Sequence, residues 1–268
     1  MTQRHGFTLL EVSIVILIIG LIVAGIATTS ALVDTAKLQS VIAEQTNYRQ
    51  AINEFRDKYQ AMPGDMSNAT SVWGTSGTAG HCTGATAMTS LPTTQATCNG
   101  DGNEMVGTST AAGVITNANL EWWLVWQHLA NARLINGRYT GGNFVAGNAS
   151  SDRMGFNLPT SKYNPGTWKL FYYRKTDNDT SMWQDDYGHV LMFGNGQSTT
   201  SHTAPILTPA DAREIDNKVD DGLPGGGTIR AFRSSVLTNC TTSDTSAANA
   251  RYNVSNQNVL CTLMFMIK

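Results

Sequence analysis

The sequence predicts an α+β fold in which one long N-terminal helix packs against a head made of a small antiparallel β-sheet with long loops. Three observations favour this fold. An apolar run occupies residues 7–27, the helical period then continues to Tyr59 with no proline before Pro63, and the rest of the chain contains short alternating segments typical of strands.

The apolar run carries one acidic residue, Glu11, just inside its start. A charge at the centre of a bilayer costs about 2.5 to 3.5 kcal/mol, so an ordinary membrane anchor would avoid this carboxylate. We therefore expect Glu11 to have a specific partner.

The residues before Glu11 indicate what that partner is. Met1 to Gly6 form a short polar leader that includes Arg4 and His5, and Phe7 opens the apolar run. This order of glycine, aromatic residue and glutamate before an apolar run resembles the class III signal of type IV pilins and of the type II secretion pseudopilins. The resemblance implies a leader at residues 1–6, cleavage by prepilin peptidase after Gly6, and methylation of the new N-terminal amine of Phe7.

Cleavage would place the charged amine of Phe7 one helical turn from Glu11. In a filament of staggered helices, Glu11 of one subunit can neutralise the Phe7 amine of a neighbour, which reduces the cost of burying both charges. The tip pseudopilins of this family typically lack the glutamate. Its presence here therefore predicts a place in the filament shaft or just below the tip.

The apolar run also fits two other kinds of segment. A secretory signal peptide would use Arg4 as its charged region and residues 25–27 as its cleavage site, but Glu11 interrupts the part that should be most apolar. A plain membrane anchor needs about 20 apolar residues, which Phe7 to Ala27 supplies. It does not explain why Gly6 and Glu11 are present.

Beyond the apolar run the helical pattern becomes amphipathic. A helix over residues 7–60, with its transmembrane and assembly segment at 7–28, would be about 80 Å long at 1.5 Å per residue. Its first half suits lipid and then a filament core, and its second half suits packing on the head. The core-facing positions are Leu32, Leu38, Val41, Ile42, Gln45, Tyr48, Ile52, Phe55 and Tyr59, and the polar positions are Asp34, Lys37, Glu44, Arg49, Asn53, Glu54, Arg56, Asp57 and Lys58.

The head occupies residues 61–268 and begins with a turn that contains Pro63 and Gly64. A Thr-, Ser-, Gly- and Ala-rich insertion of low charge follows at about 70–113. Four cysteines in an exported chain indicate disulfides, and pairing of nearest neighbours, Cys82–Cys98 and Cys240–Cys261, is the simplest of three connectivities. The resemblance adds weight to the second pair, because type IV pilins often close a C-terminal loop with such a bond.

The head has predicted helices and strands of its own. A helix begins at Asn117, runs to about Arg133 and stops before Gly137, and a second helix begins at Thr208-Pro209. Trp122, Trp123 and Trp126 cluster in the first of these helices, and we expect them to pack against the sheet and the long helix. Four strands are predicted, at residues 168–174, 189–193, 228–232 and 259–267.

Three acidic clusters contain the oxygen ligands that calcium prefers. Asn99, Asp101 and Asn103 alternate in a glycine-rich loop, as at the start of an EF-hand loop, but without its distal glutamate. The alternative is that Asp and Asn beside Gly simply form turns and caps. No cofactor is required by the sequence, so calcium is a hypothesis for these clusters.

The other two acidic clusters lie nearer the C-terminus. Some secretion pseudopilins bind calcium through a C-terminal acidic loop, and this resemblance favours the second cluster. The members are Asp216, Asp220 and Asp221 in the second cluster and Asp177, Asp179, Asp185 and Asp186 in the third.

The sequence does not indicate an enzyme. It has no G-x-S-x-G, no H-E-x-x-H and no Walker loop, and its histidines beyond the leader lack metal-ligand spacing. A net charge of −2 provides no overall basic stripe, so nucleic-acid binding is not predicted either.

The resemblance implies a structural subunit of a type IV pilus or of a secretion pseudopilus. Such a chain is made as a single-pass prepilin in the inner membrane, with its head outside the cytoplasm, and is then assembled into an extracellular or periplasmic filament. Its partners are prepilin peptidase, the inner-membrane assembly platform, copies of itself and other pilin-like subunits. The alternative is a minor pilin whose head binds a surface, as an adhesin or DNA receptor, and the insertion at about 70–113 motivates it.

Overall fold

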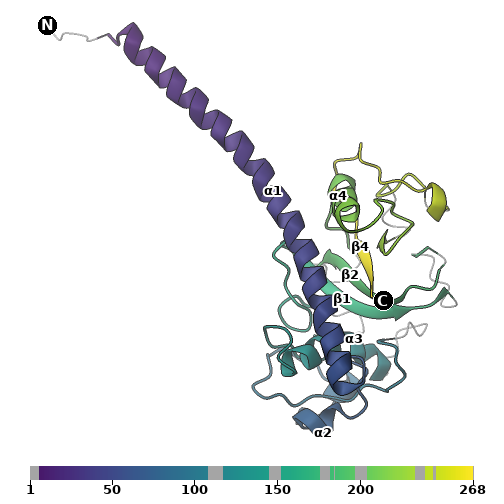
Figure 1. Cartoon of the computed structure of the whole chain (residues 1–268). Coiled ribbons are helices and arrows are strands. Elements are labelled where there is room, and N and C mark those ends of the chain that lie inside the picture. The colour runs from purple at the N-terminus through teal and green to yellow at the C-terminus, as the bar shows by residue number, and fades with distance from the viewer. Residues whose placement is uncertain are drawn as a thin grey trace.

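A long helix, α1 (Leu9–Tyr59), crosses the head with its second half and extends away from it with its first half (Figure 1). At 1.5 Å per residue its 51 residues span about 77 Å. The computed structural model describes residues 6–107, 117–144, 152–175, 182–183, 185–196, 204–232, 239–243 and 246–267, without the side chains of residues 24–31 and 117–119.

The ends of α1 follow from its sequence. Thr8 caps the N-terminus in an extended conformation, and its Oγ1 accepts a hydrogen bond from the Glu11 amide at 3.3 Å. At the other end Gln60 adopts a left-handed conformation, with φ 53°, just before Pro63. The long helix predicted over residues 7–60 is therefore confirmed, with its first helical residue at Leu9.

The head contains a four-stranded antiparallel sheet with the strand order β1-β2-β4-β3. The strands are β1 (Gly166–Tyr173), β2 (Gly188–Asn195), β3 (Ile229–Ala231) and β4 (Leu263–Ile267). The strand predicted at 259–267 was too long, because Cys261 forms an isolated bridge with Leu207 and Val259 is exposed. The predicted antiparallel α+β architecture is confirmed.

Both faces of the sheet are buried, and the side chains alternate between them as the pleat requires. One face packs with α1, α3 (Asn117–Asn131) and α4 (Pro209–Val219), while loops cover the other face. The helix-facing side chains include Trp168, Leu170, Leu191, Phe193, Leu263 and Phe265, and the loop-facing ones include Tyr173, Val190, Met192, Met264 and Met266.

The contact between α1 and the head begins at Leu38, which is 3% exposed. Leu32 was predicted on the same core-facing stripe but is 70% exposed, because the head does not reach that turn of the helix. Further along, the ring of Tyr48 meets Trp126 of α3 and Trp168 of β1 edge-on, at centroid distances of 5.1 and 5.9 Å. Tyr48 thus joins the long helix to both layers of the head.

The tryptophans of α3 pack as predicted. Trp123 and Trp126 are fully buried, and the indole nitrogen of the half-buried Trp122 donates to the carbonyl of Gly107 at 3.0 Å. The helix ends at Asn131, two residues earlier than predicted, because Arg133 takes up a left-handed conformation with φ 62°. The helix start predicted at Thr208 is confirmed, with Pro209 as the first helical residue.

Two disulfides, Cys82–Cys98 and Cys240–Cys261, tie the long loops to the core. Cys98 and Cys261 are buried with the main hydrophobic core, so each bond fixes a surface loop to packed residues. This is the nearest-neighbour pairing. The loop closures span 16 and 21 residues, which corresponds to about 3 kcal/mol each if the effect is purely one of chain entropy.

Glu44 has an unexpected role at the interface of α1 and the head. The sequence places it among the polar positions, but its two carboxylate oxygens accept hydrogen bonds from the backbone amide of Lys162 at 2.7 Å and from the indole nitrogen of Trp168 at 2.9 Å. A charged acceptor strengthens both bonds. Glu44 therefore fixes the rotation of α1 relative to β1.

We expect Glu44→Ala to lower the free energy of unfolding by about 2 kcal/mol, because it leaves the buried indole N–H of Trp168 without its acceptor. Urea unfolding followed by tryptophan fluorescence measures this change. Glu54→Ala is the matched control, since Glu54 is exposed and bonds only Gln50 of the same helix in the described part of the chain. Equal effects of the two substitutions would contradict the role of Glu44.

Candidate functional site

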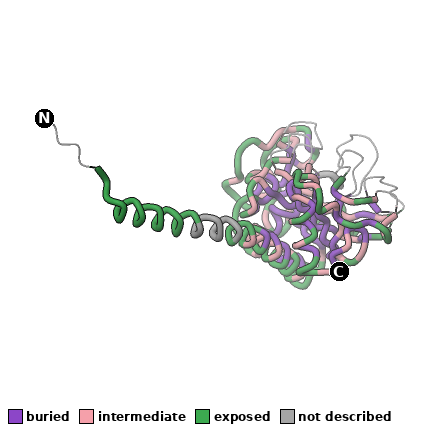
Figure 2. The backbone as a smooth tube through the Cα atoms, turned by 90° about the horizontal axis from the view of Figure 1, so that it is seen from above, coloured by how far each residue is buried: buried purple, intermediate pink, exposed green. Residues whose placement is uncertain are grey.

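The N-terminal part of α1 is the first candidate site. Every residue from Gly6 to Val23 is exposed, and the helix leaves the head as a single unsupported rod (Figure 2). Phe7 is 88% exposed and Leu17 is 71% exposed. Apolar surface of this extent marks an interaction with lipid or with other proteins.

Glu11 has a partner within its own chain. Its Oε2 accepts hydrogen bonds from the backbone amide and from the hydroxyl of Thr8, both at 2.8 Å. Together with the bond from the Glu11 amide to Thr8, this forms a capping box. The role of Thr8 was not predicted from the sequence, although the pattern T-x-x-E before an apolar run is a known signal for this motif.

The capping box leaves half of the Glu11 carboxylate available. Among the described residues, no hydrogen bond reaches its Oε1, and no cation pairs with either oxygen. Phe7, whose amine would be created by cleavage, directly precedes the capping residue Thr8. The N-terminus therefore presents an exposed carboxylate with spare acceptor capacity beside the predicted new amine.

Within the described residues, no helix combines the length and the apolar character that crossing a membrane requires.

A second candidate site is a group of three carboxylates, from Asp65, Asp101 and Glu121, each of which has an oxygen within 4.8 Å of the others. Asp65 lies in the turn after α1, Asp101 lies in the insertion, and Glu121 lies on α3. Only Asp101 belongs to the predicted calcium loop. The other two were missed because residues that are 36 and 20 positions away share no local pattern with it.

The insertion loop wraps around Asp65. The carboxylate of Asp65 accepts three backbone N–H bonds, from Gly102 at 2.7 Å, Asn103 at 3.0 Å and Glu104 at 2.8 Å. Glu121 accepts from the amides of Asp101 at 2.9 Å and Gly107 at 2.8 Å. These bonds favour the ionised carboxylates, but burial opposes them more strongly, and it raises the pKa of Glu121 to about 8 and the pKa of Asp65 to about 6.

The predicted calcium ligands Asn99 and Asn103 already accept hydrogen bonds from backbone amides. Asn99 Oδ1 accepts from the Thr70 amide at 2.8 Å, and Asn103 Oδ1 accepts from the Met105 amide at 2.8 Å. The bond of Asn103 closes a turn, and the bond of Asn99 caps the first turn of the short helix α2 (Ala69–Trp73). Turns and caps are the alternative to calcium at such residues. Calcium at Asp101 stays a prediction, with Asp65 and Glu121 as the further oxygen ligands that the fold brings there.

The second predicted cluster is brought together as a unit, since oxygens of Asp216, Asp220 and Asp221 also lie within 4.8 Å of one another. Asp216 is buried, and its carboxylate accepts from the hydroxyl of Tyr252 at 2.8 Å. Burial raises the pKa of Asp216 to about 7, and the two neighbouring aspartates add to this increase. Calcium here is likewise a prediction.

The third predicted cluster has a different environment. Asp177 and Asp179 lie outside the described residues. Asp185 pairs with Arg230 at 2.9 Å, and Asp186 accepts a hydrogen bond from the amide of Lys175 at 2.8 Å. The charge of Asp185 is therefore already balanced by a protein side chain.

Comparison with known families gives a match at the N-terminus of the chain. Residues 1–27 match the family model described as the prokaryotic N-terminal methylation motif, the class III signal of type IV pilins and pseudopilins. The resemblance that the sequence suggests is therefore confirmed for the N-terminus. No curated protein and no solved structure matches the chain.

We expect the free energy of unfolding to fall as the pH rises from about 7 to about 8, above the range in which the buried histidines gain protons on unfolding. The folded chain keeps a proton on Glu121 through most of this range, whereas the unfolded chain has already released it, so this group contributes a slope of at most about 1.4 kcal/mol per pH unit. Urea unfolding at several pH values, in EDTA, measures the slope. Glu121→Gln should reduce this slope, and the exposed control Glu54→Gln should not; a flat or rising profile in EDTA would contradict the prediction.

Repeating the series in millimolar calcium tests the calcium hypothesis, because a bound cation favours the ionised carboxylates and should flatten the profile.

Proposed function

We propose that this chain, which carries the prokaryotic N-terminal methylation motif at residues 1–27, is a structural subunit of a type IV pilus or of a type II secretion pseudopilus. The motif is the observation that carries the proposal. The subunit is made as a prepilin in the inner membrane, with its head outside the cytoplasm, and is then assembled into an extracellular or periplasmic filament.

The geometry around Gly6 supports processing by prepilin peptidase. Residues 6–8 are exposed and lie outside any helix, since α1 begins only at Leu9. A side-chain atom added at Gly6 would have no heavy atom within 4 Å among the described residues. A peptidase can therefore reach the bond between Gly6 and Phe7 without unfolding the helix.

The exposed first half of α1 supports assembly through this helix. Its apolar side chains have no cover from the described part of the head, so transfer into lipid or into a bundle of like helices removes them from water. The capping box holds Glu11 at the first turn of the helix, with Oε1 directed to no group of its own chain in the described residues. The methylated amine of Phe7 in a neighbouring copy is a suitable cation for it.

The structure also offers support for the alternative, a minor pilin with a surface-binding head. The described part of the insertion at about 70–113 packs against the core. The disulfide Cys82–Cys98 and the hydrogen bonds from its backbone amides to Asp65 hold it there. Glu104 of the insertion also lines a polar cleft beside the end of α1. An ordered insertion that shapes a cleft is what a binding head requires.

Mass spectrometry of the mature protein should show a chain that starts at Phe7 and carries one methyl group on its amine. The expected substrate is the bond after Gly6, so Gly6→Ala is a useful companion variant that should accumulate the uncut precursor. A mature chain starting at Thr28 would identify an ordinary secretory signal and would eliminate the proposal.

Glu11→Ala should be processed normally but incorporated into filaments at least about tenfold less, equivalent to about 1.4 kcal/mol, because the neighbour's amine loses its counter-charge. Quantification of sheared filaments by immunoblot measures this ratio. Thr8→Ala is the matched control, since it removes the hydroxyl bonded to Glu11 but keeps the carboxylate. If both variants lose incorporation equally, helix capping and not charge pairing is what assembly requires.

A further inference from the structure

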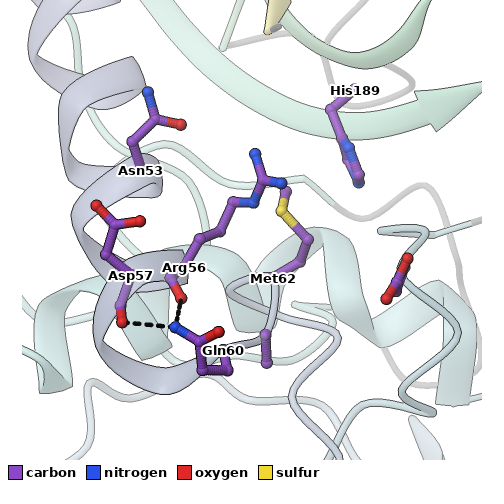
Figure 3. Close-up of a pocket in the computed structure, with 8 residues that line it drawn as sticks. Asn53, Arg56, Asp57, Gln60, Met62 and His189 are labelled. Atoms are coloured by element: carbon purple, nitrogen blue, oxygen red, sulfur yellow. Dashed lines mark hydrogen bonds between the residues drawn. The ribbon is translucent and has the colours of Figure 1, made fainter.

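A polar cleft lies where α1 ends, between the helix, the insertion and the sheet (Figure 3). Its volume is about 670 Å³, within the range of about 300 to 1,000 Å³ that small-molecule sites occupy. Asn53, Arg56, Asp57 and Gln60 line it from α1 and its cap, Glu104 from the insertion and His189 from β2. Three segments far apart in the sequence therefore build one cleft.

Arg56 is the cation of this cleft. Its side chain extends from α1 across the opening toward His189 (Figure 3). Among the described residues, its guanidinium has no ion pair and no hydrogen bond, although Asp57 and Glu104 line the same cleft. A guanidinium carries five N–H donors in a planar fork that matches a carboxylate, so this one is available to a ligand.

His189 is a neutral neighbour of Arg56. Its Nε2 accepts a hydrogen bond from the Val106 amide at 3.4 Å, so the ring proton is on Nδ1. Burial, and next the charge of Arg56, lower the pKa of His189 to about 4. The imidazole therefore stays uncharged at neutral pH, and Arg56 is left as the single positive charge among the described residues that line the cleft.

The acceptors of the cleft restrict its ligand further. The carboxylates of Asp57 and Glu104 would repel a small, highly charged anion such as phosphate, but they can accept hydrogen bonds from hydroxyl groups. The amide of Asn53 can both donate and accept, whereas the amide nitrogen of Gln60 already donates to the carbonyls of Asp57 and Arg56, so Gln60 offers its oxygen as an acceptor. A ligand that fits this set has one carboxylate for Arg56 and several hydroxyls for the other groups.

We propose that this cleft binds a carboxylated sugar, such as a uronic acid or a short chain of uronic acids. The carboxylate pairs with Arg56, and the hydroxyls bond to Asp57, Glu104 and Asn53. The site lies at the opposite end of α1 from Glu11, so it is independent of assembly. Binding of a carboxylated sugar would give the head a function beyond its structural role in a filament.

The test uses the full mature chain in detergent and titrates it with digalacturonic acid by isothermal calorimetry. Neutral lactose, a disaccharide without a carboxylate, and inorganic phosphate are the comparison ligands. We expect saturable binding of digalacturonic acid and at least about tenfold weaker binding of both comparison ligands. No saturable binding, or equal binding of lactose, would overturn the proposal, and equal binding of phosphate would show a general anion site without sugar recognition.

Arg56→Ala should weaken digalacturonic acid binding at least about tenfold. Arg49→Ala is the matched control, because Arg49 is an exposed arginine on the same helix that does not line the cleft. Equal affinities of the two variants would overturn the role of Arg56. Since the guanidinium of Arg56 has no hydrogen bond in the described part of the chain, the unfolding midpoint of Arg56→Ala should match that of the wild type, which separates lost binding from lost folding.

The same two variants separate this inference from the proposed function. Arg56→Ala should assemble into filaments at the wild-type level, whereas Glu11→Ala should retain sugar binding. Loss of binding in Glu11→Ala would contradict the independence of the two sites. If the wild-type chain assembles into filaments but does not bind digalacturonic acid, the proposed structural role stands and only the proposal of sugar binding in the cleft is refuted.

Discussion

The packing of the second half of α1 on the head is the contact on which the rest of the structure depends. Tyr48 meets a tryptophan from α3 and one from β1, and Glu44 bonds to the head through Trp168 and Lys162. Ring contacts determine how closely the helix approaches, and directional hydrogen bonds determine its rotation. Because α1 is one continuous helix, its fixed second half also determines the direction in which the apolar first half leaves the head.

The two halves of α1 differ in how their side chains are buried, although they form one continuous helix. The second half buries one stripe in the head, while the described first half exposes every side chain and so requires lipid or other subunits. Glu11 fits this arrangement, because it caps its own helix through Thr8 and keeps one oxygen for an outside partner. A single carboxylate can thus stabilise the helix end and respond to a neighbour's charge.

The carboxylate cluster and the polar cleft of the head both lie near the end of α1 and both include residues of the insertion. Backbone amides of the insertion donate hydrogen bonds to the carboxylates of Asp65 and of Glu121 on α3. The insertion also contributes Glu104 to the cleft that Arg56 and His189 line. A disulfide anchors its described part to the core, which reduces the entropy that such a loop would otherwise retain. Two features with different chemistry, a carboxylate cluster and a polar cleft, therefore share one ordered loop.

The sequence by itself determined the long helix, the antiparallel character of the sheet, the capped start of α4 and the N-terminal signal. Each of these depends on neighbours within a few positions, through helical period, alternation or a short motif, so a linear pattern is sufficient. Only the tertiary structure decided that Glu44 bonds to the head, that Leu32 lies beyond it, that Asp65 and Glu121 join Asp101, and that Arg56 faces His189. These contacts join residues that are far apart in the chain or depend on where the head ends along α1. They are set by how helices, sheet and loops pack around a common core, and local sequence carries no record of that packing.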